Sequence, residues 1–176
     1  MSRLLAISGS LRSGSSNTAV IQALAQLAPA GVEVAIYAGL ADLPPFNPDL
    51  DGAVSLPAVD ALRSELQRAD AVLISSPEYA HGVPGVLKNA LDWVVGSGEL
   101  IDKPVALVNV SPRSTYAHAQ LAETLKTMSA RINPDASITL TLSGRPADAA
   151  AVLADRSAAD ALRSALASLI ESTCPL

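Results

Sequence analysis

Polar side chains and two glycines gather near the start of the chain, in the stretch SGSLRSGSSNT (residues 8–18). Gly9 and Gly14 have the spacing of the glycine-rich loop that cradles triphosphates in P-loop proteins. That loop also needs a lysine directly after the second glycine, to reach the β- and γ-phosphates, and here Ser15 stands in its place. The stretch therefore does not predict hydrolysis of a nucleoside triphosphate.

A dinucleotide-binding turn is also a poor match. Its pattern, G-x-G-x-x-G, needs a second glycine where Ser10 stands. It further needs an acid at the end of the second strand for a ribose hydroxyl, and IYAGL (36–40) is followed by no acid before Asp42. Neither nucleotide motif explains the stretch.

A phosphate monoester fits the stretch better. The first N–H groups of a helix are free and carry partial positive charge, and a helix is expected from Asn17 onward. The side chains that can donate to an anion here are those of Ser10, Ser15, Ser16, Asn17 and Thr18, and Arg12 adds a positive charge. Helix capping by Ser16 or Asn17 is an alternative, but it accounts for only one or two of these residues.

Hydrophobic periodicity indicates the elements that position this stretch. Short apolar runs predict strands at 3–8, 32–37, 71–76, 105–110 and 137–142. Amphipathic spacing predicts helices from Asn17 to the break at Pro29 and Gly31, and at 56–70, 84–95, 115–131 and 155–172. Strands that alternate with helices predict a doubly wound α/β domain, a parallel sheet covered on both faces. Ligands of such sheets bind beyond the carboxyl ends of the strands.

Length and composition narrow the class of protein. The chain has 176 residues, suited to one domain spanning 1–176, and 49% of them are hydrophobic. A net charge of -5 argues against a nucleic-acid partner. Cys174 is the single cysteine and is expected to be an unreactive thiol in the tail, which favours a reducing compartment. No apolar run is long enough for a signal peptide or a membrane span, so a cytoplasmic protein without membrane contact is expected.

A second dense stretch, SPEYAHGVPGVLKNALDWV (76–94), follows the third predicted strand. Together, GSLRSGSSN (9–17) and PEYAHGVPGVLKNALDW (77–93) resemble the NAD(P)H-dependent FMN reductase family, and the similarity includes LPPFNPDLD (43–51). The resemblance implies a flavodoxin-like fold, a five-stranded parallel sheet in the order 2-1-3-4-5 with helices on both faces. It also implies FMN as cofactor and NADPH or NADH as electron donor, without ranking the two donors.

The resemblance implies roles for particular residues. The FMN phosphate would be held by Ser10, Arg12, Ser16, Asn17 and Thr18. The isoalloxazine ring would lie along Pro77, Glu78, Tyr79, Ala80, His81 and Gly82. The chain departs from the family at Ala80, where an asparagine is common, and after the fourth strand, where a glycine-rich segment is replaced by Ser111, Pro112, Arg113 and Ser114.

The loop after the fourth strand leaves two questions open. Ser111 is expected to donate to the edge of the flavin ring. Arg113 either offers its charge to a phosphate of the nicotinamide dinucleotide or an anionic acceptor, or is a solvated surface arginine.

Several nearby residues have a simpler interpretation. Glu78 is either a ring neighbour or a solvated loop acid. Lys88 and Asp92, four residues apart, are interpreted as a surface ion pair or a subunit contact and not as catalytic residues. Trp93 is expected at a subunit interface, and the apolar LPPFNP segment (43–48) either forms a subunit contact or packs on its own domain. His118 is expected to be structural, and two histidines with one distant cysteine predict no metal site.

The predicted function follows from the cofactor. Hydride would pass from a nicotinamide to bound FMN and then, by a ping-pong mechanism, to a quinone, azo compound, metal oxyanion or free flavin. No catalytic acid or base is expected, because the protein supplies position and electrostatics. The resemblance implies a homodimer or homotetramer. Two alternatives stay open, an electron-transfer flavoprotein without a nicotinamide site and a regulatory or scaffold protein that has lost the cofactor.

Overall fold

The structure, a computed structural model, describes residues 2–142, 144 and 146–173. Cys174 lies outside the described residues. A parallel sheet in the order β2-β1-β3-β4-β5 forms the centre of the molecule, which confirms the predicted flavodoxin-like order. The strands are β1 (Ser2–Ser8), β2 (Val32–Tyr37), β3 (Ala71–Ser75), β4 (Pro104–Asn109), β5 (Arg131–Ile132) and β6 (Ile138–Thr139).

The three central strands are apolar because both of their faces are covered. Every residue of β3 and β4 is buried, as is β1 from Leu4 onward. In register, Leu5 pairs with Val72, which in turn pairs with Val105. The edge strand β2 is only half-buried. Parallel strands buried on both faces read as continuous hydrophobic runs, which is why their positions could be predicted well.

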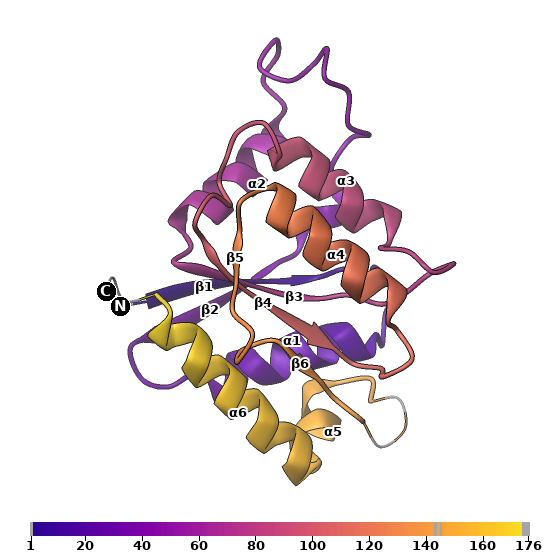
Figure 1. Cartoon of the computed structure of the whole chain (residues 1–176), viewed down its shortest axis with the longest axis vertical. Helices are drawn as coiled ribbons and strands as arrows, with labels where there is room; N and C mark the ends of the chain where they lie inside the picture. The colour runs from indigo at the N-terminus through magenta and orange to yellow at the C-terminus, as the bar shows by residue number, and fades with distance from the viewer. Residues whose placement is uncertain (1, 143, 145, 174–176) are drawn as a thin grey trace.

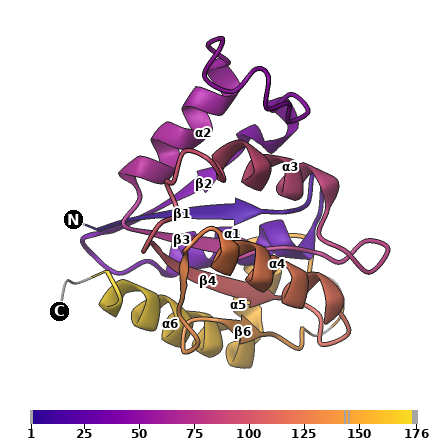
Figure 2. The ribbon, with the colours of Figure 1, turned by 45° about the horizontal axis from the view of Figure 1, so that its top comes forward.

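Two layers of helices cover the sheet (Figures 1 and 2). One face carries α2 (Pro57–Arg68), α3 (Gly85–Val94) and α4 (Tyr116–Thr127), and the other carries α1 (Ser16–Leu27), α5 (Ala149–Ala154) and α6 (Arg156–Glu171). A short 3-10 helix, η1 (Gly39–Asp42), follows β2. Each layer encloses its own hydrophobic cluster against the sheet. The short helix α5 and η1 were not expected from the sequence.

Trp93 lies inside the molecule, so its predicted place at a subunit interface is wrong. Its side chain is fully buried, and its Nε1 donates to the Pro44 carbonyl oxygen at 2.8 Å. The ring of Phe46 packs edge-on against it with centroids 5.0 Å apart. Asn89 bonds the same segment twice, accepting from Phe46 N and donating to Pro44 O. The LPPFNP segment therefore packs on its own domain.

The last strand differs most from its prediction at 137–142. Only Ile138–Thr139 pair with β4, and an earlier piece, Arg131–Ile132, pairs with the start of the same strand. Between them Asn133 Oδ1 accepts from the N–H groups of Asp135 and Ala136, a local turn that competes with the ladder. Ser137 Oγ then accepts from Leu107 N at 3.1 Å, taking the place of a backbone partner.

The carboxyl ends of the strands meet at the end of the molecule opposite the two termini (Figure 2). The loops that follow β1, β3 and β4 lie together there, and the hairpin between β3 and α3 projects furthest (Figure 2). Within the described ranges, no helix is both long enough and apolar enough to cross a lipid bilayer.

Candidate functional site

A cavity of about 600 Å³ opens at this end of the sheet. Its wall includes most of the residues that the sequence analysis assigned to a cofactor, namely Ser10, Arg12, Ser16, Asn17, Pro77, Glu78, Tyr79 and Ser111. Ser15 and Arg113, which the sequence analysis weighed without assigning, line it too. Three loops far apart in the sequence therefore meet around one space.

The amino end of α1 is uncapped and lies at this cavity. Ser15 is the N-cap residue, and its side chain makes no capping hydrogen bond. The first helical backbone bond runs from Ala19 N to Ser15 O, so the N–H groups of the preceding turn have no helical partner. No acid lies in the first turn. A helix start of this kind attracts an anion.

Hydrogen bonds hold the polar side chains of the loop in place. The buried Asn17 accepts from Ser75 Oγ at 2.9 Å, which leaves its Nδ2 group without a partner among the described residues. Arg12 is exposed and donates to the Gly14 carbonyl oxygen at 2.9 Å. Ser16 Oγ donates to the Pro146 carbonyl oxygen at 2.9 Å. The amide of Asn17 is therefore fixed, whereas the Arg12 side chain is tied only at the surface.

Gly9 and Gly14 are favoured at their positions for different structural reasons. A Cβ on Gly9 would lie 2.6 Å from Ser76 Oγ and 3.1 Å from a Leu87 methyl carbon, so only glycine lets the loop cross the end of β3. Gly14 has φ +66, a conformation that glycine adopts without steric cost. The P-loop spacing is thus a consequence of chain packing and turn geometry.

The second wall is a tight hairpin, residues 77–83. Tyr79 and Gly82 exchange both backbone hydrogen bonds, at 3.1 and 3.0 Å. The two residues between them, Ala80 and His81, have φ values of 48 and 60. Positive φ at both central positions defines a type I′ turn, for which Asn-Gly is the preferred pair. The Ala-His pair departs from that preference.

The hairpin is attached to the first turns of α4. Glu78 Oε2 accepts from Ala117 N at 2.9 Å, and Gln120 Oε1 accepts from Val83 N at 2.9 Å. Thr115, the N-cap residue of α4, makes no side-chain cap. The carboxylate of Glu78 therefore serves as the anion at the start of α4, and it is not a solvated loop acid.

The third wall is the turn after β4, and one buried side chain clamps it. Asn109 Oδ1 accepts from Ser111 N and its Nδ2 donates to Ser114 O, both at 3.1 Å. Ser114 N also donates to Ser111 O at 3.0 Å. Pro112 at the second position of this turn fixes the backbone further. The segment is rigid without the glycines that the family resemblance led us to expect.

Four of the predicted residues lie off the cavity wall. Thr18 faces inward, and its Oγ1 lies 2.9 Å from Ser8 Oγ. Ala80, His81 and Gly82 form the outer half of the hairpin turn, beyond the lining residues. Their part in binding stays a prediction. The wall also contains residues that the sequence analysis did not assign, and these are Val110, Pro112, Ser114, Thr141, Leu142 and Gly144. Val110, Pro112 and Ser114 follow β4, and their place after a central strand was the available signal. Thr141, Leu142 and Gly144 follow β6, which ends earlier than the strand predicted at 137–142.

The charges at the cavity are mainly cationic. Arg12 and Arg113 line it, and the carboxylate of Glu78 is occupied by the start of α4. His118 is half-buried in α4, where burial lowers the pKa of its imidazole, and it is not a lining residue. In the part of the chain that the structure describes, no group of three or more His, Cys, Asp or Glu residues is arranged to hold a metal ion. The site suits an anionic ligand held between two loops that hydrogen bonds keep in place.

Comparisons with known proteins agree with this geometry. The family model described as NADPH-dependent FMN reductase matches residues 2–142. A quinone reductase of Escherichia coli (strain K12) is 41% identical over 105 residues, which is 59% of this chain and 54% of that relative. An NAD(P)H-dependent FMN reductase of Pseudomonas aeruginosa is 40% identical over 111 residues, which is 62% of this chain and 60% of that relative. The matched region thus spans little more than half the length of these curated relatives.

A solved structure extends the similarity to nearly the whole chain. The flavoenzyme NAD(P)H:(acceptor) oxidoreductase of Paracoccus denitrificans superposes with a TM-score of 0.81 and is 27% identical. The superposition covers 98% of this chain and 97% of that chain.

Proposed function

Because the chain belongs to the NADPH-dependent FMN reductase family, we propose that it is an FMN-dependent NAD(P)H oxidoreductase. The observation that carries the proposal is the uncapped amino end of α1, which opens with its ring of hydroxyl, amide and guanidinium groups into the cavity. An electron carrier would need the flavin alone. With Arg12 taken by the flavin phosphate, Arg113 on the cavity wall supports a further anionic substrate, such as a nicotinamide dinucleotide.

The phosphate of FMN fits the first wall. Backbone N–H groups of the first turn of α1 and the Ser10 and Ser15 hydroxyls offer donors, as does the Nδ2 of Asn17, which has no partner among the described residues. Arg12 offers positive charge. These groups suit a phosphate monoester without a metal ion. Thr18 supports the loop from behind through Ser8.

The flavin ring fits between the hairpin and the clamped turn. The Tyr79–Gly82 hairpin and the Ser111–Ser114 turn are both held by hydrogen bonds in the free protein, so little order has to be created on binding. Pro77, Glu78 and Tyr79 form one wall and Ser111 the other. Backbone N–H groups and the Ser111 hydroxyl are the donors available to the polar edge of the ring.

FMN bound in this cavity would supply the redox chemistry, the net transfer of a hydride from a dihydronicotinamide, with a proton from solvent, to an acceptor such as a quinone, giving NAD(P)⁺ and hydroquinone. The chain positions the reactants, and its fixed dipoles and the Arg113 charge stabilise negative charge that develops at the ring. Both substrates would use the same open side of the cavity in turn, a ping-pong order. Small acceptors, namely quinones, azo compounds, metal oxyanions or free flavin, fit such a site.

We further propose that a second copy of the chain packs on the outer face of α3 and α4, as a homodimer or as half of a homotetramer. A hollow of about 210 Å³ lies there between the two helices. Leu91 and Met128 line it, and Val95 at its edge is 52% exposed. Lys88 and Asp92 pair at 2.5 Å beside these apolar groups. The face carries apolar groups together with one positive and one negative side chain, so it can match the same face of a second copy. Docking there would leave the cavity open.

Steady-state kinetics test the proposed activity. The protein is loaded with FMN, freed of excess flavin, and assayed for NADPH and NADH oxidation with menadione as acceptor. We expect turnover only with retained FMN, and parallel double-reciprocal lines when both substrates are varied. Retained flavin without nicotinamide oxidation would identify an electron carrier, and failure to retain flavin would identify a protein that has lost the cofactor.

A further inference from the structure

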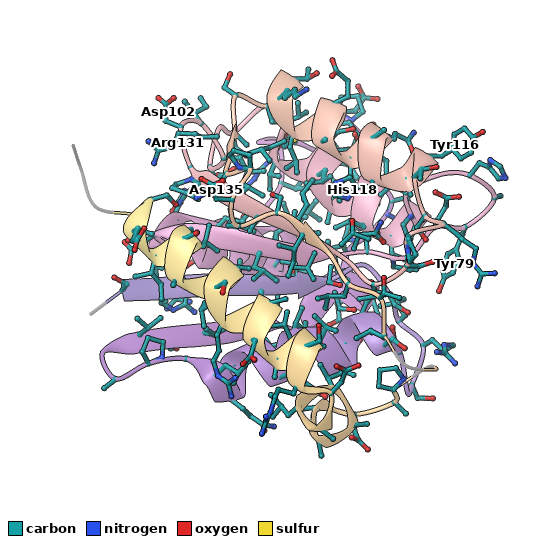
Figure 3. All side chains as sticks on the ribbon, turned by 60° about the horizontal axis from the view of Figure 1, so that its bottom comes forward. Tyr79, Asp102, Tyr116, His118, Arg131 and Asp135 are labelled. Atoms are coloured by element: carbon teal, nitrogen blue, oxygen red, sulfur yellow. The ribbon has the colours of Figure 1, made fainter. Side chains whose placement is uncertain are left out.

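The two exposed tyrosines lie at the same end of the molecule, and one of them, Tyr79, is part of the cavity wall. The chain has three tyrosines, one tryptophan and one phenylalanine. Trp93 is buried and the half-buried Phe46 packs against it, whereas Tyr79 and Tyr116 are 53% and 59% exposed. Figure 3 shows these two tyrosines at the same end of the molecule, with His118 further inside.

One of these tyrosines forms a pair with a histidine. The rings of His81 and Tyr116 have centroids 4.4 Å apart and are tilted by 41°. His81 belongs to the hairpin and Tyr116 is the first residue of α4. The bonds from Ala117 N to Glu78 and from Val83 N to Gln120 join the same two segments, so the backbones that carry the two rings are held together. Both rings nevertheless remain exposed to solvent.

The conformation of the turn adds a second argument. Ala80 and His81 both adopt the left-handed conformation, which is costly for residues with a Cβ. The imidazole gains little burial in return, because it is exposed. Strained residues that packing does not explain gather at ligand sites, and exposed apolar rings beside a cavity mark a contact surface.

We propose that His81 and Tyr116 form the binding surface for the electron acceptor, and that this surface selects planar aromatic acceptors such as quinones. This inference rests on the proposed function and names its acceptor class. The tilted pair offers a ring face for stacking, next to Tyr79 on the cavity wall. The imidazole N–H and the phenol O–H can donate to the carbonyl oxygens of a quinone. Metal oxyanions present no flat face to such a surface.

Variants of the pair test the proposal by binding and by kinetics. Tyr116→Leu removes the ring, Tyr116→Phe keeps it, and His81→Gly removes the imidazole while relieving the turn. Binding of menadione to the oxidised, FMN-loaded protein is measured by equilibrium dialysis without nicotinamide. The ratio of kcat/KM for menadione to that for ferricyanide, an acceptor without a ring, is measured in parallel.

We expect Tyr116→Leu and His81→Gly to weaken menadione binding, and to lower the kcat/KM ratio, by roughly tenfold, the loss of one aromatic stacking contact. Tyr116→Phe should lose less affinity than Tyr116→Leu, since it keeps the stacking contact and removes only the hydrogen bond from the phenol. Equal losses with both acceptors, or unchanged menadione binding in all three variants, would overturn the proposal. Reduction of the wild-type flavin by NADPH without any acceptor tests the proposed function separately, so that the two failures are distinguishable.

Discussion

Arg12 carries the most direct residue-level prediction. Its guanidinium lies on the cavity wall near the uncapped start of α1 and is exposed. We expect Arg12→Gln to weaken FMN binding by about fivefold, the loss of roughly 1 kcal/mol that a solvent-screened, charge-assisted contact to phosphate provides. Fluorescence quenching during flavin titration measures the effect.

Riboflavin, which lacks the phosphate, is the matched ligand for this test. Its affinity should not change in Arg12→Gln, and Arg113→Gln serves as the matched arginine variant on the opposite wall. If FMN and riboflavin lost affinity equally, the phosphate would not be bound near Arg12.

The turn at Ala80 gives a prediction about stability. Because Ala80 has φ 48, a residue that tolerates the left-handed conformation should raise the free energy of unfolding. We expect Ala80→Asn to raise it by about 0.5–1 kcal/mol in urea denaturation. Ala119→Asn, at an exposed position inside α4, should lower stability instead. A loss of stability in Ala80→Asn would mean that the left-handed turn is not adopted in solution.

At the level of elements, the sequence predicted the central sheet well, because the continuous hydrophobic pattern of these strands matches their burial on both faces. The runs at β1, β3 and β4 are apolar throughout, and a strand covered on both faces has to be. The last strand was misjudged because Asn133 and Ser137 replace ladder contacts with side-chain hydrogen bonds. The hydrophobic pattern of a sequence does not show where a side chain takes the place of a backbone hydrogen-bond partner.

The sequence predicted which loops form the site better than it predicted the hydrogen bonds that individual side chains make there. The positions after β1, β3 and β4 followed from the fold, and Ser10, Asn17 and Tyr79 do line the cavity. The capping role of Glu78 was not predictable, because it depends on the distance to Ala117, which lies 39 residues further along the chain. Trp93 was misplaced for a similar reason, since its partner Pro44 comes from a distant loop.

Helix α4 gives a prediction about pH. Burial lowers the pKa of His118 below its ordinary value of 6.5, because the charged imidazole is poorly solvated in the folded protein. As the pH falls through 6.5, the unfolded chain takes up a proton that the folded protein does not, so folding stability decreases. Above that pH the residue is neutral in both states and has no such effect.

Urea denaturation between pH 7.5 and 5 measures this effect, over a range set by the ordinary histidine pKa of about 6.5. His118→Gln should lose stability less steeply toward low pH than the wild type, with His81→Gln, at an exposed position, as the matched variant. Identical pH profiles for wild type and His118→Gln would show that burial of this imidazole does not oppose its protonation.

At the scale of the whole molecule, we propose that residues 1–176 act as a single flavodoxin-like domain. Both hydrophobic clusters pack on the same sheet, one on each face. The cavity lies at the carboxyl end of the strands, and the hollow lined by both apolar and polar side chains lies on the outer face of α3 and α4. A second copy could therefore dock without closing the site, so flavin binding and assembly are expected to be separable.

Anaerobic reduction of the FMN-loaded protein tests the central claim most directly. Stoichiometric NADPH or NADH is mixed with the protein in the absence of any acceptor, and the absorbance of oxidised flavin is followed. The account predicts rapid bleaching by at least one of the two nicotinamides, and return of the colour when menadione is added. A bound flavin that neither nicotinamide bleaches would contradict it.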